Sequence, residues 1–294
     1  MEKVRIQKML SEAGVASRRD VEEMILQGRI TVNGDLVTSL PCFCEPGDEI
    51  RVDGELVRKR AEEKVYVLLN KPRGVICTQR DEPGRSRPKA VDLVSGLDCR
   101  VYCVGRLDEG STGLIVLTND GELTQRLTHP SYEVERTYVA RIDGVMTPEH
   151  VDKLRAGLFV AGRRRAGAKV QLIRGGHDES LLQVKVAEGR NCQVRRMLLQ
   201  LGYKVKRLHR SSIGPLDDRG LKVGRFRLLN KAEISLLRRS AGLDGGVAHG
   251  PHARGPASVL PTRGRPARGK ASAAEAPGNK WRPGRPRRPP RRKG

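Results

Sequence analysis

Residues 241–294 limit the fold more than any other part of the chain, because their composition does not support a packed core. They hold 9 of the 17 prolines and carry 13 basic but only 2 acidic side chains. Such a segment cannot bury enough apolar surface to offset the conformational entropy lost on folding. We therefore predict a disordered Arg/Pro/Gly-rich basic tail, and we expect the folded part to lie within residues 1–240.

The charge of the chain indicates a polyanionic partner. Its 294 residues include 57 Lys and Arg against 34 Asp and Glu, which gives a formal net charge of +23 at pH 7. Cationic surface attracts phosphate groups and displaces their counterions, so nucleic acid is the first partner to consider. The tail could serve as a phosphate-binding arm or could only keep the protein soluble, and composition does not separate these two interpretations.

Membrane and secretory signals are missing from the sequence. No run approaches the roughly 18 apolar residues of a membrane span, and residues 1–7 have no apolar signal core. Six cysteines occur without a C-x-x-C pair, which argues against a zinc or thioredoxin-like site. We expect a cytoplasmic protein with reduced thiols, no bound metal and no membrane contact.

The start of the chain predicts a small module of helices and strands. Apolar positions recur at helical spacing in residues 5–13 and again in residues 17–28. The period then changes to two on either side of an Asn-Gly pair at Asn33, which is typical of a hairpin turn. This pattern predicts a domain over residues 1–60, with a charged linker over residues 58–65.

From residue 65 the chain changes to strand-like sequence. Apolar runs at residues 65–70 and 75–78 predict two strands on either side of a Lys-Pro-Arg-Gly turn. The polar residues that follow, 79–89, predict a loop that could reach a ligand.

Asp108 is the residue of this central region that could carry chemistry. It lies within residues 104–121, a glycine-rich turn followed by an apolar strand, and a helix is predicted over residues 121–128. A tight turn of this kind lets the backbone approach a ligand closely. From the residues alone, Asp108 is more readily a turn residue or a partner of Arg106 than a catalytic group.

Two long motifs resemble known families. The strings K-M-L-S-E-A-G-V-A-S-R-R and G-R-I-T-V-N-G are similar to the S4 RNA-binding domain. The string G-R-L-D-E-G-S-T-G-L-I-V-L-T-N-D-G around Asp108 resembles the catalytic motif of pseudouridine synthases of the RsuA/RluB type, and matching segments continue to residue 238. The resemblance implies an α+β fold, with an S4-like RNA-binding domain at residues 1–60 and a synthase domain on a mixed, mostly antiparallel sheet at residues 61–240.

The resemblance also implies a reaction. A pseudouridine synthase breaks the C1′–N1 bond of an RNA uridine, turns the base and rejoins it through C5, after the base has left the stack. This isomerisation requires no cofactor and no metal. By resemblance, Asp108 is the essential carboxylate, and whether it acts as a nucleophile or as a base stays open.

Four further residues are implied as active-site support. They are Tyr138 stacking on the uracil, Arg195 pairing with Asp108, Leu198 packing on the uracil ring, and Arg106 entering the RNA helix. On sequence pattern alone, Tyr138 and Leu198 would be core residues, and Arg195 would be a phosphate contact on a helix.

Several basic residues are candidates for phosphate contacts, which position RNA without reading its sequence. These candidates are Arg5, Lys8, Arg18, Arg19, Arg29, Lys71, Arg73, Arg190, Arg196, Arg207 and Arg210. Cys192 stands where the family commonly has a larger, often basic residue, and we interpret it as the loss of a local RNA contact that leaves the chemistry intact. The partner implied is ribosomal RNA or a ribosomal subunit precursor, bound by a monomer.

The target within ribosomal RNA is indicated by resemblance as well. The strings R-L-T-H-P-S-Y-E-V and R-S-S-I-G-P-L look most like the branch that modifies 23S rRNA of the large subunit, and the 16S-specific branch is the alternative. A noncatalytic RNA-binding or ribosome-assembly protein on the same scaffold fits the composition equally well, although Asp108, Tyr138 and Arg195 are all present. An acid–base hydrolase using Asp108 with His129 has little support, because no second carboxylate motif accompanies them.

Overall fold

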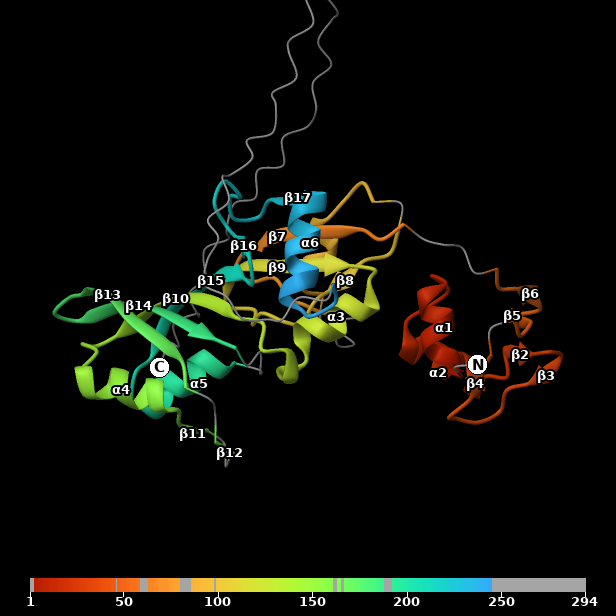
Figure 1. The fold of residues 1–294 in the computed structure, drawn as a ribbon, viewed down its shortest axis with the longest axis horizontal. Helices are drawn as coiled ribbons and strands as arrows, with labels where there is room; N and C mark the ends of the chain where they lie inside the picture. The colour runs from red at the N-terminus through yellow and green to blue at the C-terminus, as the bar shows by residue number, and fades with distance from the viewer. Residues whose placement is uncertain are drawn as a thin grey trace, which may run out of the picture. The chain divides into compact units, whose positions relative to one another are not determined.

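The computed structural model divides the ordered elements between an N-terminal domain and a larger sheet domain (Figure 1). Residues 245–294 of the predicted basic tail and the middle of the predicted linker lie outside the described residues, whereas Ala241 and Leu243 pack with the apolar core. Within the described part of the chain, every helix is too short or too polar to cross a membrane. The residues described are 3–45, 47–58, 63–79, 86–97, 99–160, 163–164, 167–187 and 192–244.

The N-terminal domain has the two helices and the small sheet that the sequence predicts. Helix α2 begins after Ser17, whose hydroxyl accepts a hydrogen bond from the Asp20 amide at 3.2 Å while Asp20 caps Ser17 in return. Asn33 and Gly34 both have positive φ, which the tight hairpin between β2 and β3 requires. The elements are α1 (Ile6–Glu12), α2 (Arg18–Leu26), β1 (Val4–Arg5), β2 (Ile30–Val32), β3 (Asp35–Leu36), β4 (Phe43–Cys44), β5 (Ile50–Val52) and β6 (Glu55–Leu56).

The second domain is built on one sheet of nine strands. Their order is β13-β14-β10-β15-β9-β7-β17, with β8 paired to β9 and β16 paired to β15. Among the described strands of this sheet, only β15 and β9 run parallel, which confirms the predicted mixed, mostly antiparallel sheet. The strands are β7 (Tyr66–Lys71), β8 (Tyr102–Cys103), β9 (Thr112–Thr118), β10 (Arg136–Asp143), β13 (Lys169–Gly175), β14 (Glu179–Val186), β15 (Val205–Ile213), β16 (Leu216–Asp217) and β17 (Phe226–Leu228).

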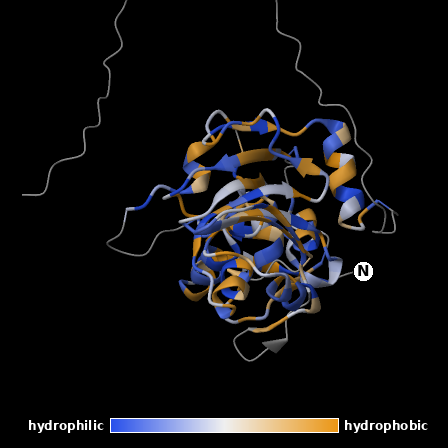
Figure 2. Cartoon of the chain, turned by 90° about the vertical axis from the view of Figure 1, so that its left-hand side faces the viewer, coloured by the Kyte–Doolittle hydropathy of each residue, from blue (hydrophilic) through white to orange (hydrophobic). Residues whose placement is uncertain are grey.

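The sheet has two halves with separate apolar cores. The β10 half comprises β13, β14, β10 and β15, and helices α4 and α5 pack against it, whereas Leu216 of β16 and Ile213 at the end of β15 pack in the core of the other half. The β9 half comprises β8, β9, β7 and β17; α3 and α6 pack on one face, and the segment around η1 packs on the other. Figure 2 shows hydrophobic residues along the strands and the helices. The remaining elements are α3 (Gly121–Thr128), α4 (Pro148–Ala156), α5 (Gln193–Gln200), α6 (Lys231–Ser240), η1 (Ala90–Leu93), η2 (Pro130–Tyr132), β11 (Phe159–Val160) and β12 (Arg163–Arg164).

Strand β7 and helix α3 show how the sequence sets the β9 half. Every residue of β7 is buried, because both faces of this half are covered. Helix α3 covers residues 121–128 as predicted, and Asp120 is its N-cap, accepting hydrogen bonds from the amides of Glu122 and Leu123 at 3.1 Å each. The Tyr66 hydroxyl donates to the other Asp120 oxygen at 2.8 Å, so the cap also ties α3 to β7.

The prediction of a strand over residues 75–78 is wrong. The segment makes one isolated bridge, between Ile76 and Lys89. The Ile76 amide donates to the Pro88 carbonyl at 3.0 Å, and the Ile76 carbonyl accepts from the Ala90 amide at 2.8 Å. The backbone groups of the segment therefore pair locally, and Ile76 lies outside the sheet.

The two halves of the sheet meet at a seam, which we define as residues 112–113 of β9 against residues 209–210 of β15. In the described structure only two residue pairs are in register there, Thr112 with His209 and Gly113 with Arg210. Gly113 has a φ of 110°, and a Cβ at this position would lie less than 3.0 Å from the backbone N and O of Arg210. Glycine is therefore required for the strands to approach this closely.

Candidate active site

The loop that carries Asp108 runs from β8 to β9 and ends at the seam. The buried Leu107 beside it donates its amide to Cys77 Sγ at 3.4 Å. The Asp108 carbonyl accepts a hydrogen bond from the Ser111 amide at 3.0 Å, which closes a tight turn. These contacts hold the Asp108 side chain, 30% exposed, at the edge of the seam.

Arg195 of helix α5 reaches across the seam to this loop. Its Nε lies 3.7 Å from Asp108 Oδ2, so the structure brings together the pair that the sequence predicts. The guanidinium also donates to the Ser111 hydroxyl at 3.1 Å, to the Gly110 carbonyl at 3.3 Å and to the Val205 carbonyl at 3.2 Å. Because both sides of the guanidinium fork are bonded, its orientation toward the carboxylate is fixed.

Cys192 makes the shortest contact to the aspartate that the structure shows. Its Sγ donates to Asp108 Oδ1 at 2.8 Å, from a residue with φ 52° directly before α5. Burial and then the hydrogen bond to Asp108 raise the pKa of the Cys192 thiol to about 11, so the thiol stays protonated and donates at neutral pH. The Cys192 side chain faces the carboxylate. Its interpretation as the loss of a local RNA contact stays a prediction.

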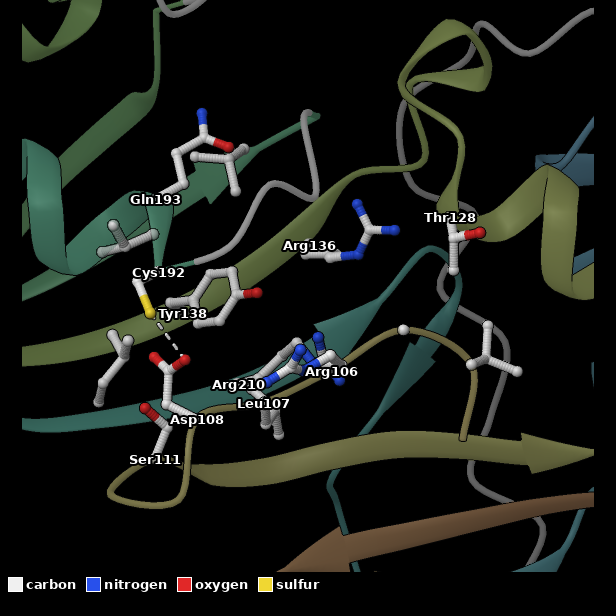
Figure 3. A pocket seen from close by; sticks show the side chains of 15 residues that line it. Arg106, Leu107, Asp108, Ser111, Thr128, Arg136, Tyr138, Cys192, Gln193 and Arg210 are labelled. Carbon is white, nitrogen blue, oxygen red and sulfur yellow. Dashed lines mark hydrogen bonds between the residues drawn. The ribbon is translucent and has the colours of Figure 1, made fainter. Parts of the chain in front are cut away.

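Asp108 lines a cavity of about 220 Å³ whose walls come from both halves of the sheet (Figure 3). Tyr138 of β10 is half-buried in one wall and packs against apolar clusters of both halves. Leu198 is 1% exposed and belongs to the core cluster behind Tyr138, whereas Val194, one helical turn earlier, is an α5 residue that lines the cavity. The cavity thus joins a carboxylate, an aromatic ring and apolar side chains.

Comparison with known proteins decides the family. Residues 65–200 match the RNA pseudouridylate synthase family, and residues 4–50 match the S4 domain. The chain is 41% identical over 239 residues to ribosomal large subunit pseudouridine synthase B of Bacillus subtilis, with 81% of this chain and 96% of that protein covered. The chain belongs to the RNA pseudouridylate synthase family.

Further similarities agree with this assignment. The Pseudomonas aeruginosa protein of the same name is 40% identical over 245 residues, which cover 81% of this synthase and 63% of that protein. A solved pseudouridylate synthase superimposes with a TM-score of 0.58 at 30% identity, covering 80% of this chain and 99% of that chain. The α+β fold and the pseudouridine synthase activity implied by the sequence motifs are therefore confirmed.

Three arginines line the cavity of this synthase. Arg106 is exposed, whereas Arg136 and Arg210 are only 8% and 3% exposed. Burial, and then the charge of Arg210, lower the pKa of Arg136. The sequence did not single out Arg136, because an arginine in a strand carries no local signal that it is buried.

The structure contradicts the prediction that Lys71 contacts RNA phosphate. Its side chain is completely buried, and its ammonium donates to the carbonyls of Pro72 at 2.9 Å and Val75 at 2.7 Å. Burial lowers the pKa of Lys71. The side chain therefore stabilises the turn after β7 and has no surface to offer to RNA.

Most of the other predicted phosphate contacts lie on the surface of the synthase. Arg29 forms a two-pronged ion pair with Asp53, at 2.7 and 2.5 Å. Arg190 lies outside the described residues. Their contact with RNA stays a prediction. The exposed set is Arg5, Lys8, Arg18, Arg19, Arg29, Arg73, Arg196 and Arg207.

Proposed function

We propose that this synthase isomerises a specific uridine of 23S ribosomal RNA, with Asp108 as the essential carboxylate. The observation that carries the proposal is the Asp108 carboxylate held between Arg195 and Cys192 at the wall of a cavity that also contains Tyr138. The choice of 23S RNA is supported by the relatives from B. subtilis and P. aeruginosa, both of which are named for the large subunit.

Each supporting residue has a defined part in this proposal. Arg195 positions the carboxylate, and Tyr138 offers an aromatic face to the extruded uracil. Val194 and the core behind it, including Leu198, close the apolar side of the cavity. Arg106, exposed at the cavity, enters the RNA helix in place of the extruded base.

We further propose a division of labour along the chain. Residues 1–60 bind RNA, residues 61–240 catalyse, and residues 241–294 add phosphate contacts that do not depend on sequence. The enzyme acts as a monomer in the cytoplasm on ribosomal RNA or a subunit precursor. Deleting residues 245–294, which leaves the packed Ala241 and Leu243 in place, should weaken RNA binding and flatten the dependence of log Kd on log salt. An unchanged slope would reject the tail as a phosphate-binding arm.

Pseudouridine mapping tests the proposal. Unmodified 23S and 16S rRNA are incubated with the purified protein, with Asp108→Asn or with Glu109→Gln, and are then mapped by carbodiimide modification and primer extension. Glu109 is the neighbouring exposed carboxylate and serves as the matched control. We expect one new stop in 23S rRNA that Glu109→Gln retains and Asp108→Asn loses, a rate decrease of at least about 100-fold.

The other outcomes are equally informative. A stop that forms only in 16S rRNA would transfer the enzyme to the small-subunit branch. Full activity of Asp108→Asn would overturn the catalytic assignment. Tight RNA binding without a stop in either RNA would favour a noncatalytic protein on the synthase scaffold.

A further inference from the structure

The cavity beside Asp108 holds buried positive charge that the described carboxylates do not neutralise. Arg136 and Arg210 line it at 8% and 3% exposure. Among the residues that the structure describes, no carboxylate forms an ion pair with either guanidinium, and Asp108 is paired with Arg195 instead. Buried charges without a counter-ion are costly, so proteins retain them mainly where they act.

The hydrogen bonds of these two arginines leave donors unused. Arg136 donates to the carbonyls of Val134, at 3.2 Å, and Leu127. Arg210 donates from Nε to the Leu114 carbonyl at 2.6 Å, while its Nη2 is buried with no partner in the protein. An unsatisfied buried donor costs free energy that a ligand acceptor would recover. Arg210 Nη2 itself has almost no accessible surface, so it is the positive charge of the two lining guanidinium groups that suits the cavity to an electron-rich group from outside the chain.

The position of the arginines favours the base of the RNA over its phosphates. When a nucleotide is extruded into an enzyme, its base enters the pocket while the phosphates stay on the strand outside. Arg73, Arg196 and Arg207 are exposed and therefore available for phosphate contacts outside the cavity. Figure 3 shows Arg136 and Arg210 in the same cavity as Tyr138 and Asp108.

We propose that Arg210 and Arg136 bind the uracil of the extruded uridine and stabilise the anion that this base becomes when the glycosidic bond breaks. The proposal rests on the pseudouridine synthase reaction, and it does not depend on which ribosomal RNA is the substrate. It also replaces the prediction that Arg210 contacts phosphate.

The reaction places negative charge on the departing base, and the two arginines can stabilise this charge. The C1′–N1 bond breaks with its electron pair on N1, so the base departs as a monoanion whose charge is shared by O2 and O4. At the sugar, Asp108 either bonds to C1′ or accepts the C2′ proton. After the base has turned, C5 bonds to C1′, the sugar step reverses, and the C5 proton is replaced by a proton on N1. Preorganised donors that meet charge only as it develops lower the barrier for the first bond cleavage.

The test compares Arg210→Met with the wild type on transcripts of 23S and 16S rRNA made with either uridine or 5-fluorouridine. Fluorine withdraws electrons, so 5-fluorouracil is a better leaving anion that depends less on the arginines. Loss of the parent nucleotide is followed by mass spectrometry in a single turnover with saturating protein, and RNA affinity is measured separately. We expect a decrease of about 100-fold in rate on uridine RNA. The decrease on 5-fluorouridine RNA should be clearly smaller, and RNA affinity and its salt dependence should be unchanged.

Controls separate this role from folding and from the assignment of the reaction. Arg141→Gln removes a partly exposed arginine of β10 that is paired with Glu179 and lies outside the lining of the cavity, and it should leave all readouts unchanged. Arg136→Met should show the same pattern as Arg210→Met, and Arg210→Lys should recover part of the rate. The proposal can therefore be tested even if one of these variants fails to fold. If the wild-type protein were inactive on the uridine transcripts of both 23S and 16S rRNA, the proposed function would be refuted, and this outcome differs from those that would refute the uracil subsite.

Two results would overturn the subsite. Weakened RNA binding with an unchanged rate at saturation would make Arg210 a phosphate contact. Equal rate decreases on uridine and 5-fluorouridine RNA would limit both arginines to positioning the cavity wall.

Discussion

The contacts within each half of the central sheet differ from the contacts that join the two halves to each other. Within the β10 half, β10 pairs with β14 along its whole length, and within the β9 half, all of β7 pairs with β9. Each half also has its own apolar core. Between the halves, the described strands share two residue pairs, at residues 112–113 and 209–210. Apolar packing therefore stabilises each half, while the seam combines close backbone contact and polar side chains with the packing of Tyr138 and Ile213 against the apolar clusters of the β9 half.

The polar contacts across the seam are largely those of the active site. Cys192 and Arg195 of the β10 side bond to the Asp108 loop of the β9 side, and Arg210 donates to the Leu114 carbonyl. The catalytic geometry and the junction of the halves are thus one set of interactions. Changes at the seam should alter both stability and activity, whereas changes within one half should mainly alter stability.

Gly113→Ala should have the largest effect, because it removes the close approach at the seam. The new Cβ would lie less than 3.0 Å from Arg210 backbone atoms, at a φ of 110° that alanine disfavours. We expect a loss of about 4 kcal/mol or more in the free energy of unfolding. Urea denaturation of Gly113→Ala beside Gly110→Ala measures this loss. At Gly110 the nearest atom to a new Cβ is 3.9 Å away, so that control should change stability by less than about 1 kcal/mol. Equal stability of the two variants would show that the halves do not depend on the seam.

Arg195→Met should have the second-largest effect, because it removes the cation that links α5 to the Asp108 loop. The variant loses the contact to Asp108 at 3.7 Å and the hydrogen bonds to Ser111 and Gly110. We expect a decrease of about 10²- to 10³-fold in the single-turnover rate of pseudouridine formation. Gln200→Ala, an exposed change on the same helix, should leave the rate unchanged. A full rate in Arg195→Met would mean that the carboxylate needs no positioning across the seam.

Cys192→Ala should have a smaller effect on the same rate. It removes one hydrogen bond, at 2.8 Å, to one oxygen of Asp108. Hydrogen bonds to charged groups contribute about 1.5–3 kcal/mol, so we expect a decrease of about 10-fold or somewhat more. Cys192→Ser keeps a donor and should stay close to wild type. If serine were as slow as alanine, the role of Cys192 would be packing and not hydrogen bonding.

The thiol of Cys192 also provides a pH readout of this contact. Because its pKa is raised to about 11, the fraction of reactive thiolate at pH 8 is small. Alkylation at pH 8 should therefore be slow and should accelerate as the pH rises toward 11. Asp108→Asn removes the negative charge that contributes to the shift, so the pKa should fall and alkylation at pH 8 should become faster. Peptide mass spectrometry of alkylated protein measures both rates, and identical rates would show that the two side chains do not interact.

Asp218→Ala should have the smallest effect of the series. The Asp218 carboxylate bonds to His209 Nε2 at 2.7 Å, and His209 Nδ1 meets the Thr112 hydroxyl at 2.8 Å, so the three residues form a chain across the seam. The chain is partly exposed, and we expect a loss of about 1 kcal/mol in the free energy of unfolding. Thermal denaturation measures it. A loss as large as that of Gly113→Ala would show that side chains, and not backbone contact, hold the halves together.

Local signals in the sequence predicted the elements of the fold well. The Ser17 cap, the Asn33 hairpin and the apolar run of β7 each depend on neighbouring residues, and the structure has all three. The motif around Asp108 identified the loop, and the pairing of Asp108 with Arg195 is observed.

Contacts between distant residues were harder to predict. Cys192 and Asp108 are separated by 84 positions, and no local pattern shows that a cysteine in a turn faces a carboxylate. The burial of Lys71 and Arg136 likewise depends on elements that follow much later in the chain. The register of the seam depends on glycine at position 113. The need for glycine there becomes apparent only when the backbone of Arg210 is placed beside it.

The central position of β15 in the sheet affects how the nascent chain can fold. This strand is made after both β9 and β10, yet it stands between them. Until residues 205–213 have been synthesised, the facing edges of β10 and β9 have no partner, and unpaired edges invite pairing with other chains. The two sides of the active site therefore cannot be joined before residues 205–213 have been made and β15 stands between β10 and β9.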